Sequence, residues 1–119
     1  MTLSSAFPRR GEIWFVRLPT DPPGKGARPV VVVSTDDRNS HPRANTVLVV
    51  PLTTSVVKNV ATHVYLSPGE TGLEQSVLKA EDIAVVPKSE LQEPRYKLRA
   101  LSHHRVCELV ERIRYAMGC

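Results

Sequence analysis

Two predicted strand ends carry the side chains best suited to chemistry on a phosphate group. Arg28 opens a segment with four consecutive valines, directly after a loop that contains Gly24 and Gly26. A stiff strand anchors the root of such a side chain, and the planar fork of guanidinium N–H donors matches phosphate oxygens. Thr53 and Thr54 close another valine-rich segment and offer hydroxyl groups. Taken alone, Arg28 also fits a surface ion pair, and Thr53 also fits a strand-end hydrogen bond to the backbone.

A second group of residues could be considered for metal binding. His103 and Cys107 are four residues apart, on one face of a predicted helix, and His104 is adjacent. Zinc needs three or four converging ligands, and this face supplies two. His41 and His63 are isolated in the sequence. For the helix cluster we therefore expect exposed His103 and His104, a partly buried Cys107 and no metal site.

Other catalytic motifs are absent from the sequence, and its length limits the fold. No GxSxG elbow, cysteine-protease signature, P-loop or dinucleotide-binding motif occurs, so we expect no cofactor. The 119 residues have room for one domain, placed at 1–119, with a frayed segment at 1–8. The chain has no apolar run of membrane-spanning length and no secretory signal pattern, which predicts a cytoplasmic protein.

The net charge of +4 is confined to the first half of the chain. Residues 1–60 carry eight basic and four acidic side chains, whereas residues 61–119 carry eight of each. A positive half favours an anionic partner, either nucleic acid or an acidic protein segment. A solvated basic face explains the same charge equally well.

Hydrophobic patterning predicts a mostly β protein. Runs of β-branched and aromatic residues, bounded by Pro- and Gly-containing loops, predict strands at 12–18, 28–34, 46–53, 62–66, 76–79 and 83–86. Pro51 would place its strand at a sheet edge or next to a bulge. Residues 35–45 are predicted to be a loop, and residues 67–72 a turn.

A C-terminal helix is predicted over residues 102–117. Its apolar stripe repeats with helical spacing and consists of Val106, Leu109, Val110, Ile113 and Met117. Ser102 is suited to cap the N-terminus, and Gly118 to end the helix. Short strands followed by one helix predict a small, strongly curved, barrel-like sheet with the helix packed on it.

Three segments, in this order and at this spacing, match motifs of a known family. They are RGEIW at 10–14, RPVVV at 28–32 and VVPLT at 49–53, and the likeness covers about residues 9–91. The chain resembles the MazF/PemK (Kid-like) toxin family of type II toxin–antitoxin systems. The resemblance implies a small SH3-like or plasmid-toxin barrel, of the kind found in MazF, Kid and CcdB.

The resemblance also implies an activity and its residues. Members of the family are bacterial homodimers that cut single-stranded RNA without a metal, leaving 2′,3′-cyclic phosphate and 5′-hydroxyl ends. Their partner is an antitoxin with an acidic segment. By position, the catalytic arginine falls on Arg28, the catalytic threonine on Thr53, and a downstream acidic position on Glu81. Glu81 would be a base in the reaction or a contact to a nucleobase edge, although a solvated acid near Lys79 also explains it.

Two loops, 19–27 and 54–61, are the segments expected to select the RNA sequence, because mobile loops on rigid strands commonly carry recognition. The residues assigned to RNA binding are Lys25, Gly26, Thr54, Ser55, Lys58 and Lys79. The aromatic residues considered for stacking on bases are Trp14, Phe15, Tyr65 and Tyr96. Strand aromatics usually pack inward, so core positions are expected for Trp14 and Phe15.

Two positions depart from the family pattern. Pro23 stands five positions before Arg28, where many members carry an acidic residue. Ala84 stands where an arginine often follows the downstream acid. These departures leave two alternatives open: a non-catalytic toxin that acts on DNA gyrase, as CcdB toxins do, and a degenerate member that only binds antitoxin or RNA.

Overall fold

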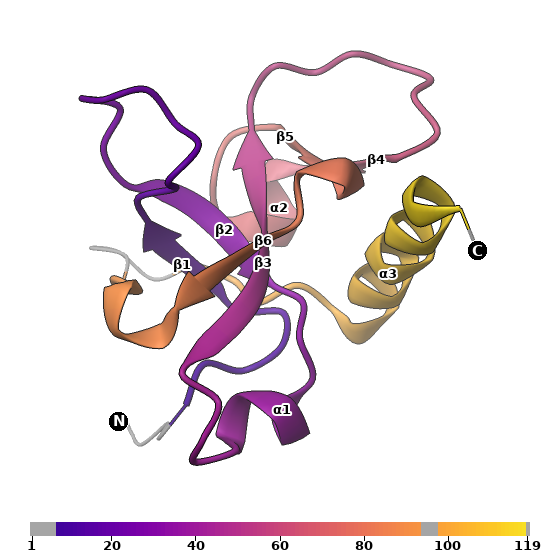
Figure 1. Ribbon diagram of the computed structural model, residues 1–119. Helices are drawn as coiled ribbons and strands as arrows, with labels where there is room; N and C mark the ends of the chain where they lie inside the picture. Colours follow the sequence, from indigo (N-terminus) through magenta and orange to yellow (C-terminus); the bar gives the residue numbers. More distant parts are fainter. Residues whose placement is uncertain (1–6, 94–97, 119) are drawn as a thin grey trace.

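A six-stranded antiparallel sheet forms the centre of the molecule (Figure 1). The computed structural model describes residues 7–93 and 98–118. The strands are β1 (Ile13–Val16), β2 (Arg28–Val32), β3 (Thr46–Thr53), β4 (His63–Leu66), β5 (Ser76–Lys79) and β6 (Ala84–Pro87). Their order is β1-β2-β3-β5-β4, with β6 also paired to β3. The predicted mostly β fold is confirmed, and the predicted strands agree with the observed ones to within two residues at each end.

Strand β3 is the centre of the sheet, because it pairs with three other strands. Along one edge it pairs with β2, and along the other it pairs first with β6 and then with β5. Of the two alternatives for Pro51, an edge strand or a bulge, the edge strand is therefore excluded. Pro51 lies between the β3 residues paired with β6 and those paired with β5, so its missing N–H donor falls where the partner changes.

The valine run in β2 explains how the sheet separates two cores. Val30 to Val33 are all buried, because β2 lies between β1 and β3. Successive side chains on a strand point to opposite faces. Val31 and Val33 accordingly belong to the core cluster that includes residues of the C-terminal helix, and Val30 and Val32 belong to a second cluster. Arg28 lies two residues before Val30 on β2, so its side chain starts on the same face of the sheet as the second cluster.

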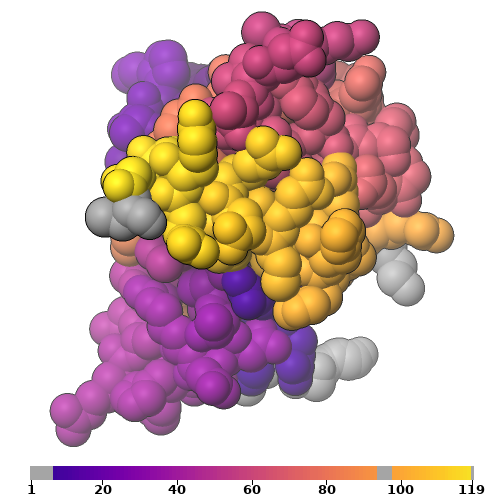
Figure 2. All heavy atoms as spheres, turned by 90° about the vertical axis from the view of Figure 1, so that its right-hand side faces the viewer, coloured from indigo at the N-terminus to yellow at the C-terminus, as the bar shows by residue number. Residues whose placement is uncertain are grey.

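Helix α3 (His103–Met117) covers the first of these faces. Figure 2 shows it across one side of the molecule, with the β3–β4 loop above it. The Ser102 hydroxyl accepts a hydrogen bond from the Arg105 N–H at 3.3 Å, and Gly118 ends the helix in the left-handed conformation, as predicted. The prediction that Met117 belongs to the buried stripe is wrong, because Met117 is 75% exposed. Burial on α3 ends at Ile113, since the last turn of the helix continues past the sheet.

Two short helices lie where a loop and a turn are predicted. Helix α1 (Asp36–Ser40) begins at Thr35, whose hydroxyl accepts a hydrogen bond from the Arg38 N–H at 3.3 Å. Helix α2 (Pro68–Thr71) begins at Ser67, whose N–H donates to the Glu70 carboxylate at 2.9 Å. Side-chain caps stabilise both helices, and neither helix is long enough to produce a helical period in the sequence.

The N-terminal segment is held against the sheet from residue 7 onward. Phe7 lies 4.8 Å beneath the Arg9 guanidinium, and Pro8 is buried. Residues 1–6, which make up most of the predicted frayed segment, lie outside the described residues. Among the described residues, no helix combines the length and apolar character needed to cross a membrane.

Gly11 ties the first strand to the segment before α3. Its φ is +90°, and a Cβ atom there would lie 2.9 Å from the Leu101 carbonyl oxygen. We expect Gly11→Ala to lower the free energy of unfolding by about 1–3 kcal/mol through backbone strain alone. The clash with Leu101 adds to this loss. Urea unfolding of the variant and the parent measures the difference.

Gly24→Ala is the matched control, because Gly24 has a φ of +88° and no atom within 4 Å of the added Cβ. It reports the cost of the left-handed conformation without a clash. If both variants lose the same stability, contact with Leu101 contributes nothing.

Candidate active site

The strand register brings Arg28 and Thr53 next to each other. Val30 pairs with Pro51 in the β2–β3 register, and continuing this register by two residues places Arg28 opposite Thr53. Residues opposite each other on antiparallel strands share one face, so both side chains start from the face away from α3. The Arg28 Nη2 donates to the carbonyl oxygen of Leu52 at 3.4 Å. The guanidinium therefore reaches the end of β3.

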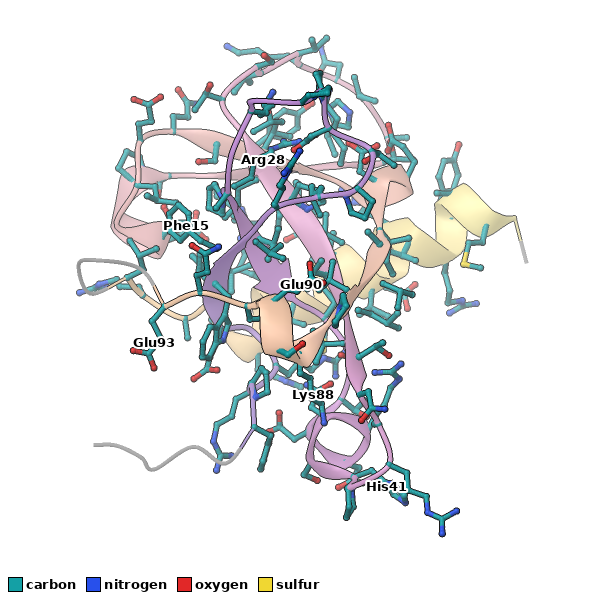
Figure 3. All side chains as sticks on the ribbon, turned by 60° about the vertical axis from the view of Figure 1, so that its left-hand side comes forward. Phe15, Arg28, His41, Lys88, Glu90 and Glu93 are labelled. Atoms are coloured by element: carbon teal, nitrogen blue, oxygen red, sulfur yellow. The ribbon has the colours of Figure 1, made fainter. Side chains whose placement is uncertain are left out.

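The loop between β1 and β2 supplies a carboxylate to Arg28 that sequence reasoning missed. Arg28 Nη1 lies 3.1 Å from Asp21 Oδ1, and the two side chains are 20% and 10% exposed. The second oxygen, Asp21 Oδ2, is buried and has no hydrogen-bond partner among the described residues. Figure 3 shows the Arg28 side chain within the arc of this loop. The sequence marks the segment as a loop, but it carries no signal for which side chain turns toward the sheet.

Thr53 lies at the rim of a groove at the end of the sheet. Its Oγ1 accepts a hydrogen bond from the Ser55 N–H at 3.3 Å, so the strand-end bond considered for this residue is present. The groove has a volume of about 560 Å³, and its lining includes Phe15, Leu52, Thr53, Thr54, Leu73 and Glu74. This combination of apolar surface and a few polar groups is typical of small-molecule sites.

The two long loops lie at the same end of the molecule as Arg28 and Thr53. Figure 1 shows the β1–β2 loop and the β3–β4 loop projecting from this end. Lys79 lies apart from them, in β5, where it pairs with His63. The predicted RNA-binding residues in the two loops are all exposed, and they are Lys25, Gly26, Thr54, Ser55 and Lys58.

Glu81 interacts with Thr62 and His63, at the start of β4 and away from Arg28 and Thr53. It lies in the 3-10 turn after β5, is 47% exposed, and places Oε2 3.8 Å from His63 Nε2. A hydrogen bond from the Thr62 hydroxyl is the largest cause that lowers the Glu81 pKa, and the charge of Lys79 adds to it. Among the described contacts, none joins Glu81 to Arg28 or Thr53. Its predicted role in the reaction remains a prediction.

Comparison with known proteins identifies the family. The family model described as "PemK-like, MazF-like toxin of type II toxin-antitoxin system" matches residues 9–117. The chain belongs to this PemK/MazF-like toxin family. No curated protein matches the sequence of this chain.

Several solved structures of PemK/MazF-like proteins share the fold of the chain. A mycobacterial endoribonuclease in complex with its cognate antitoxin is 26% identical, with a TM-score of 0.73 over 93% of this chain and 95% of that one. The Mycobacterium tuberculosis toxin MazF-mt6 is 24% identical, with a TM-score of 0.67 over 88% and 94%. MazF from Deinococcus radiodurans is 18% identical, with a TM-score of 0.73 over 97% and 100%. These matches confirm the predicted MazF-type fold.

The lowered pKa of Glu81 predicts a pH-dependent contribution to the stability of this PemK/MazF-like chain. A carboxyl group whose pKa is lower in the folded state stabilises that state above its unfolded value, here 4.5. The contribution disappears as the pH falls through the folded value. Glu81→Gln is therefore expected to lower the free energy of unfolding at pH 7, and this loss should shrink as the pH falls below 4.5. Denaturant unfolding at pH 7 and at successively lower pH values measures this, and a loss that stays constant would contradict it.

The aromatic residues considered for base stacking have different surroundings. Trp14 is half-buried against the second core cluster, as predicted. Phe15 is half-buried and lines the groove beside Thr53, so the prediction of a core position holds only in part. The Tyr65 hydroxyl donates to the carbonyl oxygen of Val57 at 2.5 Å. Tyr96 lies outside the described residues.

The His/Cys cluster on α3 is exposed. The prediction of a partly buried Cys107 is wrong, because the residue lies about 100° around the helix from its buried neighbour Val106. Its Sγ is 3.4 Å from His103 Nε2, and His104 is also exposed. Within residues 7–93 and 98–118, no group of three or more His, Cys, Asp or Glu side chains could hold a metal ion.

Proposed function

We propose that this toxin is a sequence-specific endoribonuclease that cuts single-stranded RNA without a metal ion. Its products would be a 2′,3′-cyclic phosphate and a 5′-hydroxyl. The observation that carries the proposal is that the Arg28 guanidinium reaches the carbonyl oxygen of Leu52, the residue before Thr53, in a chain of this family. The mycobacterial relative at 26% identity is itself named an endoribonuclease, which supports it.

The reaction needs no nucleophile from the protein, because the 2′-hydroxyl of the RNA attacks its own neighbouring phosphorus. The protein must hold the 2′-oxygen, the phosphorus and the leaving 5′-oxygen in line. It must also stabilise the negative charge that grows on the phosphoryl oxygens. We assign the second task to Arg28, whose guanidinium is a planar fork of several N–H donors. Thr53 donates its hydroxyl hydrogen to the same phosphate.

RNA would enter across the end of the molecule where the two long loops lie. Lysine side chains there neutralise phosphates, and small residues such as Gly26 allow the backbone to approach. Lys79 would contact RNA that continues along β5. The residues we propose for RNA binding are Lys25, Gly26, Thr54, Ser55, Lys58 and Lys79.

The proposed partners follow from the same family. The mycobacterial relative is in complex with its cognate antitoxin, which supports an antitoxin as the partner of this chain. An acidic antitoxin segment would suit the net positive charge of residues 1–60. We also propose a homodimer that acts in the bacterial cytoplasm.

A purified-protein assay tests the proposal against its alternatives. The protein is incubated with a long single-stranded RNA in excess chelator, and separately with DNA gyrase and a plasmid. Cleavage at a defined set of sites is expected, with supercoiling unaffected. Intact RNA with inhibited gyrase would favour the CcdB-like alternative. Intact RNA without gyrase inhibition would favour a member that only binds its antitoxin or RNA.

A further inference from the structure

The proposed reaction leaves one proton without an acceptor. The 2′-hydroxyl must lose its proton as it attacks, and a positioned base accelerates this step. Arg28 has no acceptor atom, and the Thr53 hydroxyl is a weak base whose oxygen already accepts a hydrogen bond from Ser55. Glu81 is bonded to Thr62 and is near His63 at a different part of the sheet. The described residues in contact with Arg28 therefore include a single carboxylate, that of Asp21.

One oxygen of the Asp21 carboxylate is paired with Arg28, and the other is free to accept a hydrogen bond. The Asp21 side chain is 10% exposed, and Oδ1 accepts a hydrogen bond from Arg28 Nη1 at 3.1 Å. Oδ2 is buried without a hydrogen-bond partner among the described residues. Buried carboxylate oxygens are nearly always paired, so an unpaired one beside a reactive arginine is a marked exception. A nucleotide whose phosphate is bound to Arg28 carries a 2′-hydroxyl, and this O–H group would donate a hydrogen bond to Asp21 Oδ2.

The loop that carries Asp21 is able to admit such a substrate. Residues 22–27 are exposed, and Gly24 and Gly26 have positive φ values. Asp21 itself anchors the loop, through its N–H to the Leu18 carbonyl oxygen at 3.1 Å and through the ion pair with Arg28. Since Oδ2 is covered in the free protein, a role for this oxygen requires the loop to shift when the ribose enters. The ion pair would keep the carboxylate directed toward Arg28 during that shift.

We infer that Asp21 is the proton acceptor for the 2′-hydroxyl, an inference that rests on the proposed RNA cleavage. The proton passes from the 2′-oxygen to Asp21 Oδ2 while the bond from the 2′-oxygen to phosphorus forms. The bond from phosphorus to the 5′-oxygen breaks, and this oxygen takes a proton from a water molecule. Asp21 then returns its proton to solvent. Atoms and charges balance without any further reactant.

Asp21→Asn tests the inference, with single-turnover cleavage of a short RNA measured from pH 5.5 to pH 9. The amide keeps the shape of the side chain and cannot accept the proton. The cleavage rate constant is expected to fall at least about 10²-fold at pH 7. The rate constant of the variant should then rise in proportion to the hydroxide concentration up to pH 9, whereas that of the parent should level off within this range. Asp21→Glu keeps a carboxylate and should recover the levelling profile at a reduced rate.

Asp37→Asn is the matched control, since Asp37 is exposed in α1, beyond the opposite end of β2. It should keep both the rate and the profile of the parent. Thermal melting of each variant confirms that it is folded. Among the described residues, Arg28 is the charged group in contact with Asp21. Asp21→Asn could therefore also shift the position of the Arg28 guanidinium.

Three results would overturn the inference. An equal loss at every pH, with an unchanged profile, would make Asp21 a positioning residue for Arg28. Faster cleavage or tighter RNA binding would show that its carboxylate competes with the phosphate. A hydroxide-dependent profile in Glu81→Gln and not in Asp21→Asn would assign the base to Glu81. The parent protein distinguishes these results from failure of the proposed function, because in that case it would not cut RNA at all.

Discussion

Replacing Arg28 with alanine is expected to lower the rate constant for RNA cleavage by about 10²–10³-fold, or about 2.7–4 kcal/mol of transition-state stabilisation. The guanidinium is held from two sides, by Asp21 Oδ1 at 3.1 Å and the Leu52 carbonyl oxygen at 3.4 Å. It is therefore already oriented before charge develops on the phosphoryl oxygens, and alanine supplies no donor in its place. Single-turnover cleavage of a short RNA at saturating protein measures the rate constant.

Two further variants make the Arg28 prediction specific. Arg28→Lys keeps the positive charge but loses the planar fork, and should fall between the parent and alanine. Arg43→Ala removes an exposed arginine from the segment after α1 and should leave the rate constant unchanged. Removing Arg28 also leaves Asp21 buried without its partner, so the rates are compared below the melting temperature of each variant. If folded Arg28→Ala cuts as fast as the parent, Arg28 has no role in the transition state.

Replacing Leu109 with alanine is expected to lower the free energy of unfolding by about 2–5 kcal/mol. Leu109 is 0% exposed and belongs to the core cluster that joins α3 to the sheet, with Val31 and Val50 among its members. The substitution removes apolar contacts and leaves a cavity in packing that α3 cannot fully close. Urea unfolding, with the slope checked for two-state behaviour, measures the loss.

The control for Leu109 lies on the same helix. Tyr115 is 68% exposed, so Tyr115→Ala should change the free energy of unfolding by less than about 0.5 kcal/mol. A similar loss in both variants would mean that helix propensity, and not burial against the sheet, sets the stability of α3. A loss below 1 kcal/mol in Leu109→Ala alone would mean that α3 is not part of the cooperative core.

Hydrophobic patterning predicted the elements that place an apolar run or stripe against a core. The valine run of β2 and the apolar stripe of α3 follow from burial, because both elements pack against a core. Helices α1 and α2 depend on caps at Thr35 and Ser67, which act over a single turn and leave no period to detect. Exposure at the end of α3 was also missed, because the spacing of Met117 matches the stripe whether or not the sheet extends beneath it.

The candidate site was predictable where strands position it and not where a loop does. Arg28 and Thr53 lie at strand ends, and continuing the β2–β3 register by two residues beyond Val30 and Pro51 places them opposite each other. Asp21 reaches Arg28 through a loop whose conformation the sequence does not specify. Pro23 occupies the position where the family pattern leads one to look for an acid, and the chain provides its carboxylate two residues earlier.

We propose that the RNA supplies its own nucleophile while Arg28 and Thr53 hold the phosphate. A short RNA that contains one cleavage site is synthesised with and without a single 2′-deoxy substitution on the 5′ side of the scissile bond, and both are incubated with the protein in chelator. The unmodified RNA should be cut to a 2′,3′-cyclic phosphate and a 5′-hydroxyl, and the 2′-deoxy RNA should stay intact at that site. Cleavage of the 2′-deoxy RNA, or products with 3′-hydroxyl and 5′-phosphate ends, would contradict this account.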